Sequence, residues 1–114
     1  MGWTLLQTRE DSALWKQRQS EVRKAFKHAW SGYKQFAMGY DELQPVGRVG
    51  TDGLGGLGAT VVDALDTAMI MGLGDVVEDA GSWIQKNLLE RMSVKGQVII
   101  STDRLREVPP LCIF

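Results

Sequence analysis

GLGGLGATVVDALDTAMIM occupies residues 53–71 and joins a glycine-rich loop to a strongly apolar segment. The segment is apolar almost all round, yet it carries two aspartates, Asp63 and Asp66. A buried carboxylate costs free energy unless hydrogen-bond donors or a cation stabilise it. The stretch therefore predicts a helix that is buried on most sides and that carries either a polar network or a binding site.

Two interpretations of these aspartates stay open. Asp63 and Asp66 are three residues apart, and Asp63 and Thr67 are four apart, so all three share one helix face. They could contact substrate hydroxyls or position a water molecule. Alternatively, Thr60 and Asp63 form a capping box at the start of the helix, and Asp66 pairs with an arginine. Spacing alone favours the second interpretation.

The residues before the loop predict a long amphipathic helix. Apolar and aromatic side chains recur there at steps of three, four and seven residues. The pattern predicts a helix over Ser12–Met38, which Asp11 or Ser12 can cap and Gly39 can end. Residues 1–11 are predicted to be unstructured.

The segment 39–58 contains seven glycines and Pro45, and we expect an irregular loop there. Asp41 and Glu42 lie in this loop. They are either turn residues on the surface or contacts to a sugar or a metal, and their position in a turn favours the first interpretation.

A third helix is predicted to begin at Asp75, with Glu78 as its capping partner, and its apolar face fades near Arg91. A short strand is predicted at residues 97–100, and residues 101–114 show no useful period. The predicted fold class is all-α with an irregular C-terminal tail.

Composition excludes several classes of function. The 114 residues fit one small domain, and their net charge of −1 offers no basic surface for nucleic acid or an anionic membrane. One cysteine, Cys112, cannot form an intrachain disulfide, and one histidine, His28, leaves zinc without a ligand set. No secretory signal is evident, and no apolar run approaches the ~20 residues that span a bilayer. GLGGLG is not a dinucleotide-binding fingerprint, because a helix stands where that motif needs a strand.

Three segments occur in the order and spacing of a known family: HAWSGYKQFAMGYDELQP (28–45), VVDALDTAMIMGL (61–73) and SWIQKNL (82–88). They resemble the start of the catalytic domain of class I α-1,2-mannosidases, glycoside hydrolase family 47. By this resemblance, residues 12–98 are the N-terminal part of such a domain and residues 99–114 are a divergent tail.

The resemblance implies an (α/α)7 barrel, of which this chain supplies the leading helical hairpins. It also implies calcium-dependent, inverting removal of α-1,2-linked mannose from high-mannose N-glycans in the endoplasmic reticulum or Golgi. Most members are type II membrane proteins with a luminal catalytic domain. Asp63 matches the first aspartate of the family's Val-Asp-x-x-Asp-Thr motif. The candidates for positioning substrate or a polar network are Asp63, Asp66, Thr67, Asp41 and Glu42.

The chain departs from the family pattern after Val98. Members continue there with Phe-Glu-Thr-Thr-Ile-Arg, whose glutamate is the usual catalytic acid, whereas this chain has Ile99, Ile100 and Ser101. The sequence therefore assigns no catalytic acid or base, no metal ligand and no membrane anchor to the chain. We expect the chain to be inactive alone. The alternatives are a small helical interaction protein that uses Phe26 and Trp30, or a non-functional product of splicing or of a gene model.

Overall fold

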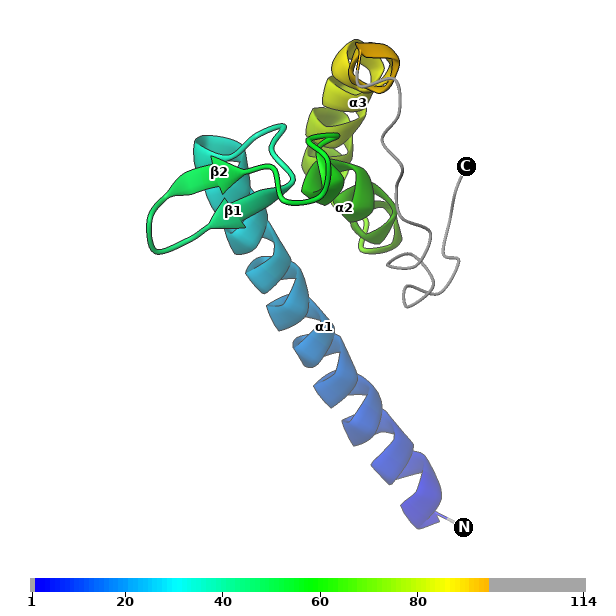
Figure 1. Ribbon diagram of the computed structural model, residues 1–114. Coiled ribbons are helices and arrows are strands. Elements are labelled where there is room, and N and C mark those ends of the chain that lie inside the picture. Colours follow the sequence, from blue (N-terminus) through cyan, green and yellow to red (C-terminus); the bar gives the residue numbers. More distant parts are fainter. Residues whose placement is uncertain (1, 95–114) are drawn as a thin grey trace.

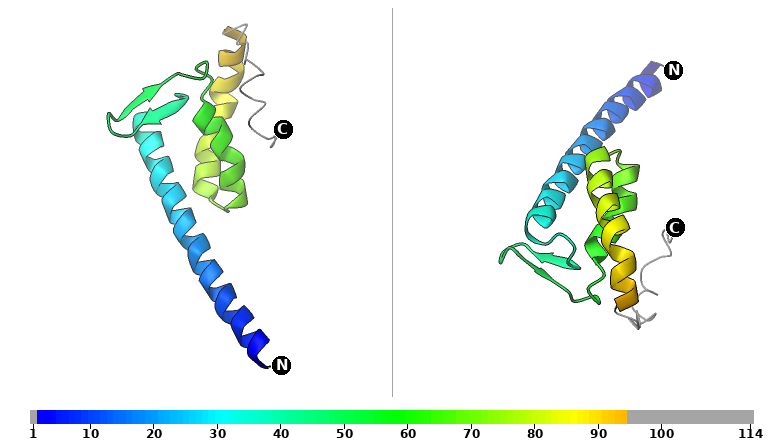
Figure 2. Two further views of the ribbon diagram at one scale, coloured as in Figure 1. Left: turned by 60° about the horizontal axis from the view of Figure 1, so that its bottom comes forward. Right: turned by 90° about the horizontal axis from the view of Figure 1, so that it is seen from above.

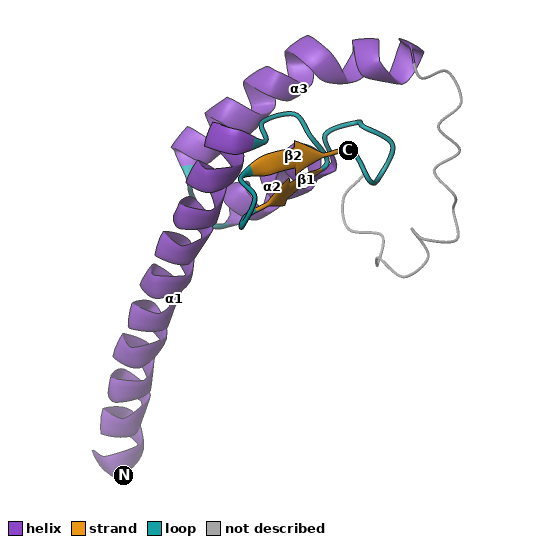
Figure 3. Cartoon of the chain, turned by 60° about the vertical axis from the view of Figure 1, so that its left-hand side comes forward, coloured by secondary structure: helices purple, strands orange, loops and turns teal. Residues whose placement is uncertain are grey.

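The computed structural model describes residues 2–94, with side chains from residue 8 onward. Three helices and one antiparallel β-hairpin make up this part of the chain (Figure 1). The elements are α1 (Gly2–Phe36), β1 (Glu42–Gln44), β2 (Val49–Thr51), α2 (Ala59–Ile70) and α3 (Gly74–Val94). The predicted, mainly helical fold is confirmed (Figure 3). The predicted strand at 97–100 and the tail at 99–114 lie outside the described residues.

Helix α1 begins at Gly2, ten residues earlier than the sequence pattern predicts. Residues 2–11, expected to be unstructured, are therefore helical. The physical reason is that residues 3–31 contain no glycine or proline that would break a helix. Side chains from residue 8 to residue 25 are all exposed, and this part of α1 extends away from the other elements (Figure 1).

The C-terminal third of α1 contributes to one small hydrophobic core. The buried residues come from α1 and its following turn, from α2, from the turn between α2 and α3, and from α3. Trp30 and Tyr33 lie with their ring centroids 5.5 Å apart, which is within the range of favourable aromatic pairs. The full set is Trp30, Tyr33, Ala37, Val61, Ala68, Leu73, Val76 and Ala80.

Polar contacts tie α1 to α3 beside this core. Lys27 pairs with Asp75 at 2.9 Å, and Lys34 pairs with Asp79 at 2.7 Å. The Trp30 indole N–H also donates to Asp79, at 3.3 Å. The lysines are half exposed, so solvent screens both pairs, and their main effect is to fix how the two helices align.

Asp75 was expected to cap α3, but the helix begins one residue earlier, at Gly74. Asp75 lies in the first turn and points to α1. Its hydrogen bond with the Lys27 ammonium is the main reason why the pKa of Asp75 is lowered.

The loop at 39–58 is more ordered than predicted, because it contains the β-hairpin. Glu42 pairs with Thr51 and Gln44 pairs with Val49, so four residues, 45–48, connect the strands. Arg48 has a left-handed φ of 53°, as tight hairpin connections require. Two strands of three residues carry too short an alternation to be recognised from the sequence.

Helices α2 and α3 form a hairpin and lie side by side in both views of Figure 2. The apolar pattern predicts an α2 that a complete domain buries on most sides and that this chain alone leaves with exposed apolar surface, and the described residues show that exposed surface. Val61 and Ala68 are buried, but Met69 and Ile70 are 62% and 84% exposed. The reason is that α1 and α3 cover only one side of α2, and no element within residues 2–94 covers the other.

The Trp83 ring of α3 explains why two loop positions are glycine. Gly39 and Gly58 both have positive φ, 89° and 78°. A Cβ atom at Gly58 would lie 2.5 Å from Trp83 Cη2, and one at Gly39 would lie 2.8 Å from Trp83 Nε1. Both positions therefore require glycine for backbone conformation and for space.

Replacing Gly58 by alanine should separate these two requirements when it is compared with Gly72→Ala. Gly72 also has a positive φ, 68°, but a Cβ atom at this position would meet no atom within 4 Å. We expect Gly72→Ala to cost about 1 kcal/mol and Gly58→Ala about 3–4 kcal/mol in the free energy of unfolding by urea. Gly74→Ala, with neither constraint, serves as the control. Equal losses at Gly58 and Gly72 would contradict the packing of Trp83 against the loop.

Candidate functional site

The most buried charged group of the described chain is the carboxylate of Asp41, with a relative exposure of 0%. It lies in the turn between α1 and β1, and the glycine loop wraps around it. Four backbone N–H groups donate to its two oxygens. They belong to Leu54 at 2.9 Å, Gly56 at 2.7 Å, Gly58 at 3.0 Å and Ala59 at 3.0 Å.

The main chain of Asp41 extends this network to α2. Its carbonyl oxygen accepts the N–H of Thr60 at 3.1 Å and the Thr60 hydroxyl at 2.6 Å. Its own N–H donates to the Asp52 carboxylate at 3.2 Å. Asp41 thus supplies acceptors to the first two amides of α2 from a different part of the chain.

The capping box predicted for Thr60 and Asp63 is therefore wrong. Helix α2 begins at Ala59, its N-cap is Gly58 in a left-handed conformation, and no side chain of the N-cap residue bonds to the first turn. The Thr60 hydroxyl is a donor to Asp41. The sequence pattern fits a local cap, but the buried carboxylate of Asp41 takes its place.

The sequence favoured a surface turn residue at Asp41, and this prediction is wrong because Asp41 is fully buried. Burial opposes its ionisation, but the N–H groups of Ala59, Gly56, Leu54 and Gly58 outweigh this effect and lower its pKa. With both oxygens used by backbone donors and no solvent exposure, the carboxylate is not open to a sugar or a metal ion in this conformation.

Three side chains that the sequence pattern did not single out complete the network. The Tyr33 hydroxyl accepts the Gly39 N–H at 3.1 Å and donates to the Tyr40 carbonyl at 2.7 Å. Burial is the main reason why the pKa of Tyr33 is raised. Arg91 donates to the carbonyls of Gly39 and Gly56, and its guanidinium lies 4.9 Å from the centre of the Trp83 ring. Trp83 and Arg91 are more than forty residues from Asp41 in the sequence, and Tyr33 fits the apolar stripe of α1, so no local sequence pattern indicates that the three side chains meet there.

Asp63, Asp66 and Thr67 lie on α2, away from the Asp41 carboxylate. Asp63 is exposed, and Asp66 and Thr67 are half-buried. An Asp66 oxygen accepts the Thr67 N–H at 2.7 Å. Within the described residues, the ion pairs all involve lysines, so the predicted pairing of Asp66 with an arginine does not occur there. Asp63 makes no side-chain hydrogen bond or ion pair with residues 8–94.

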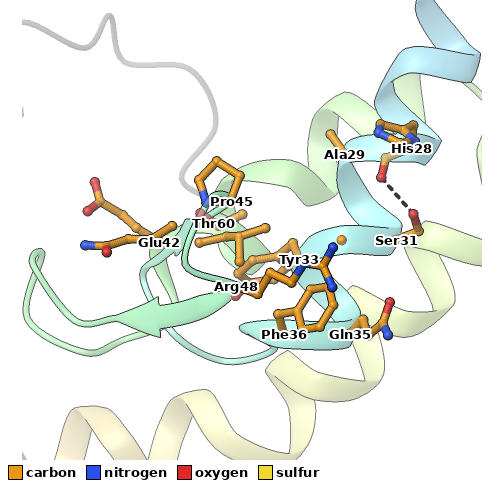
Figure 4. Close-up of a pocket in the computed structure, with 13 residues that line it drawn as sticks. His28, Ala29, Ser31, Tyr33, Gln35, Phe36, Glu42, Pro45, Arg48 and Thr60 are labelled. Atoms are coloured by element: carbon orange, nitrogen blue, oxygen red, sulfur yellow. Dashed lines mark hydrogen bonds between the residues drawn. The ribbon is translucent and has the colours of Figure 1, made fainter.

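Glu42 is exposed and lies at the edge of an open groove of 1120 Å³ between the end of α1 and the hairpin. Figure 4 shows Arg48 beside Phe36 in this groove, with Ser31 and then His28 lying further toward the N-terminus of α1. The Arg48 guanidinium lies 5.6 Å from the centre of the Phe36 ring. Thr60 also lines the groove, whereas Asp63 does not. The structure therefore separates Glu42 from the aspartates of α2.

No group of three histidine, cysteine or acidic side chains within the described residues is placed to hold a metal ion. The same residues form no helix that is both long and apolar enough to cross a membrane.

Comparison with known proteins shows the class of protein that contains this arrangement. The sequence model of glycosyl hydrolase family 47 matches residues 25–101, which include the Asp41 network and all of α2. The chain belongs to this family.

Several curated relatives are mannosidases. Mannosyl-oligosaccharide 1,2-alpha-mannosidase MNS3 of Arabidopsis thaliana is 63% identical over 92 residues, which are 81% of this chain and 15% of the relative. The relative MNS1 of the same plant is 52% identical over 73 residues, 64% of this chain and 13% of the relative. The endoplasmic reticulum mannosyl-oligosaccharide 1,2-alpha-mannosidase of Rattus norvegicus is 41% identical over 100 residues, 82% of this chain and 15% of the relative. The chain spans about 15% of the length of these relatives, and no solved structure matches it.

The stability of the chain should fall in acid because of Asp41. Its pKa is lower in the folded state than the value of about 3.9 in an unfolded chain, so its stabilisation is complete above that value. The stabilisation is lost as the pH falls through the lower, folded pKa. Urea unfolding at pH 7 should show Asp41→Asn to be less stable than the parent by about 2–4 kcal/mol.

The difference between the parent and Asp41→Asn should begin to shrink below about pH 4, where Asp41 of the unfolded chain takes up a proton. It should be smallest below the lowered pKa of the folded state, where the folded parent also carries a neutral side chain. Glu78→Gln is the matched control, since Glu78 is an exposed carboxylate with no ion pair among the described side chains. A difference for Asp41→Asn that stays constant from neutral pH into acid would refute the ionised state of this buried carboxylate.

Proposed function

We propose that the chain is the N-terminal portion of an α-1,2-mannosidase domain that removes mannose from high-mannose N-glycans. The observation that carries the proposal is the 63% identity to MNS3 over 92 residues. We further propose the luminal side of the endoplasmic reticulum or Golgi as its place of action, with anchoring and calcium supplied by other segments of a complete enzyme. The name of the rat relative supports the first of these compartments.

Inverting hydrolysis requires an acid that protonates the leaving oxygen and a base that activates water, on carboxylates about 6.5–9.5 Å apart. No residue within 2–94 is proposed as this acid or this base. Asp63 is proposed as a substrate- or network-positioning residue, because it is an exposed carboxylate with no side-chain partner in the described chain. Asp66 and Thr67 lie about one helical turn from Asp63, and the Asp66 carboxylate accepts the Thr67 backbone N–H.

Asp41 and Glu42 take different parts in this proposal. Asp41 supports the network that holds the loop and the start of α2, as its four N–H donors indicate. Glu42 is exposed at the groove and remains available to a ligand or to another segment of the domain.

A chimera tests the proposal. Residues 25–94 of this chain would replace the matching segment of MNS3, and hydrolysis of an α-1,2-linked mannose oligosaccharide would be measured. We expect the chimera to be active and Asp63→Asn to lower its kcat/KM by about 100-fold or more, because transition-state interactions of a positioned carboxylate are lost. Glu78→Gln, an exposed change on α3, is the matched control. A folded but inactive chimera, or equal effects of the two substitutions, would count against the proposal.

The 114-residue chain by itself should not hydrolyse α-1,2-mannobiose. The expectation follows from the departure after Val98, where Ile99 and Ile100 stand at the family's catalytic-acid segment. Release of mannose by the purified chain would be measured with and without added calcium. Turnover above the buffer rate would show that the missing acid is not essential or has been replaced.

A second candidate function is that of a small helical interaction protein. The surface expected from Phe26 and Trp30 is not available in the described chain, because Trp30 is 6% exposed and Phe26 packs against the same core. The observation that favours this function is instead the solvent-exposed part of α1, where Trp15 and Val22 are 59% and 54% exposed. Monodisperse folding of the chain at micromolar concentration, together with an inactive chimera, would support this alternative.

A further inference from the structure

The start of α2 depends on residues outside the helix. Its first two amides, of Ala59 and Thr60, donate to the carboxylate and to the carbonyl of Asp41 at 3.0 and 3.1 Å. The first bond within the helix joins the Val62 N–H to the Gly58 carbonyl at 3.1 Å. Because unpaired first-turn amides allow a helix to fray, Asp41 determines where α2 begins.

Asp63 follows within the next turn of α2, and its side chain makes no hydrogen bond or ion pair with residues 8–94 that would hold it. Its backbone is therefore placed by the helix alone. The anchor at Asp41 is fully buried and is fixed by the loop amides of Leu54 and Gly56 as well as by those of α2. A shift of this anchor would move or fray the turn that carries Asp63.

From this arrangement we propose that Asp41 is a positioning residue for Asp63. Its carboxylate occupies an anion site formed by four backbone N–H groups, and this bound carboxylate fixes the beginning of α2 and hence the place of Asp63. The importance of this link for glycan hydrolysis rests on the function proposed above, whereas the link itself is a property of the 114-residue chain.

The link is tested on the complete 114-residue chain by amide NMR and hydrogen exchange of Asp41→Ala. We expect the signals of Gly58, Ala59 and Asp63 to shift, and the protection of the Asp63 amide to fall by about 10-fold or more as the helix end frays. Sodium formate should reverse these changes, because formate supplies a carboxylate that fits the emptied site. Sodium chloride at the same ionic strength should not.

Asp79→Ala is the matched control, since it removes the Trp30 and Lys34 contacts between α1 and α3, whose partners lie outside α2. Its Asp63 amide should keep the parent's protection, and formate should have no effect. If Asp41→Ala does not fold without formate, Asp41→Asn, which keeps the side-chain volume, is measured instead. An unchanged Asp63 amide in the variant, or no restoration of Asp41→Ala by formate, overturns the proposal.

The chimera with MNS3 tests whether the link matters for activity. Asp41→Ala should lower kcat/KM by about 10-fold or more in the parent chimera, but by less than about 2-fold when Asp63 is already asparagine, because residues that act through one another are not additive. The same fold-loss in both backgrounds would show that Asp41 only stabilises the fold, and would overturn its positioning role.

An inactive chimera, or one that tolerates Asp63→Asn, would instead contradict the proposed function. The NMR experiment does not depend on activity and would still decide whether Asp41 places Asp63. The failure of one proposal can therefore be distinguished from the failure of the other.

Discussion

The carboxylate of Asp41 accepts N–H groups from the glycine loop and from the first turn of α2 at the same time. Ordering the six loop residues 53–58 costs about 1–2 kcal/mol each in backbone entropy, or roughly 6–12 kcal/mol. Four hydrogen bonds to a charged acceptor contribute about 1.5–3 kcal/mol each, which is also roughly 6–12 kcal/mol. The hydrogen bonds to a single buried carboxylate therefore offset the entropic cost of ordering this loop. The ordered loop in turn fixes the residue at which α2 begins.

The other side of the loop is held by α3. The Trp83 ring occupies the space that side chains at Gly39 and Gly58 would need, and Arg91 bonds the carbonyls of Gly39 and Gly56. The guanidinium stacks on the same ring, so packing and hydrogen bonding act at one place. The loop thus receives acceptors from the segment after α1 and donors from α3. This explains why a glycine-rich segment has a defined structure without a strand or helix of its own at residues 53–58.

The sequence predicts the three helices well, because apolar side chains at helical spacing can be recognised even when the elements they pack against are unknown. It misplaces their beginnings. Thr60 and Asp63 match the sequence pattern of a capping box, but Asp41, nineteen residues before Thr60, provides the hydrogen-bond acceptors in the structure. The hairpin at Glu42–Gln44 and Val49–Thr51 is too short for its alternation to be recognised. Among the candidate site residues, Asp41 is the one whose surroundings could not have been predicted, because its donors are backbone amides and leave no side-chain signature.

The part of α2 that is exposed in the described chain carries both a carboxylate and apolar side chains. Asp63 costs little where it lies, because water solvates its carboxylate, and Met69 and Ile70 are exposed on the same short helix. Covering this side with further segments of a family 47 domain would bury apolar surface, which is favourable, but would also remove water from Asp63. The carboxylate would then need new donors, and sugar hydroxyls or a polar network are the kinds of group that could provide them. The apolar residues favour covering α2, whereas Asp63, which has no side-chain hydrogen bond or ion pair within residues 8–94, requires that any such cover be polar at one point.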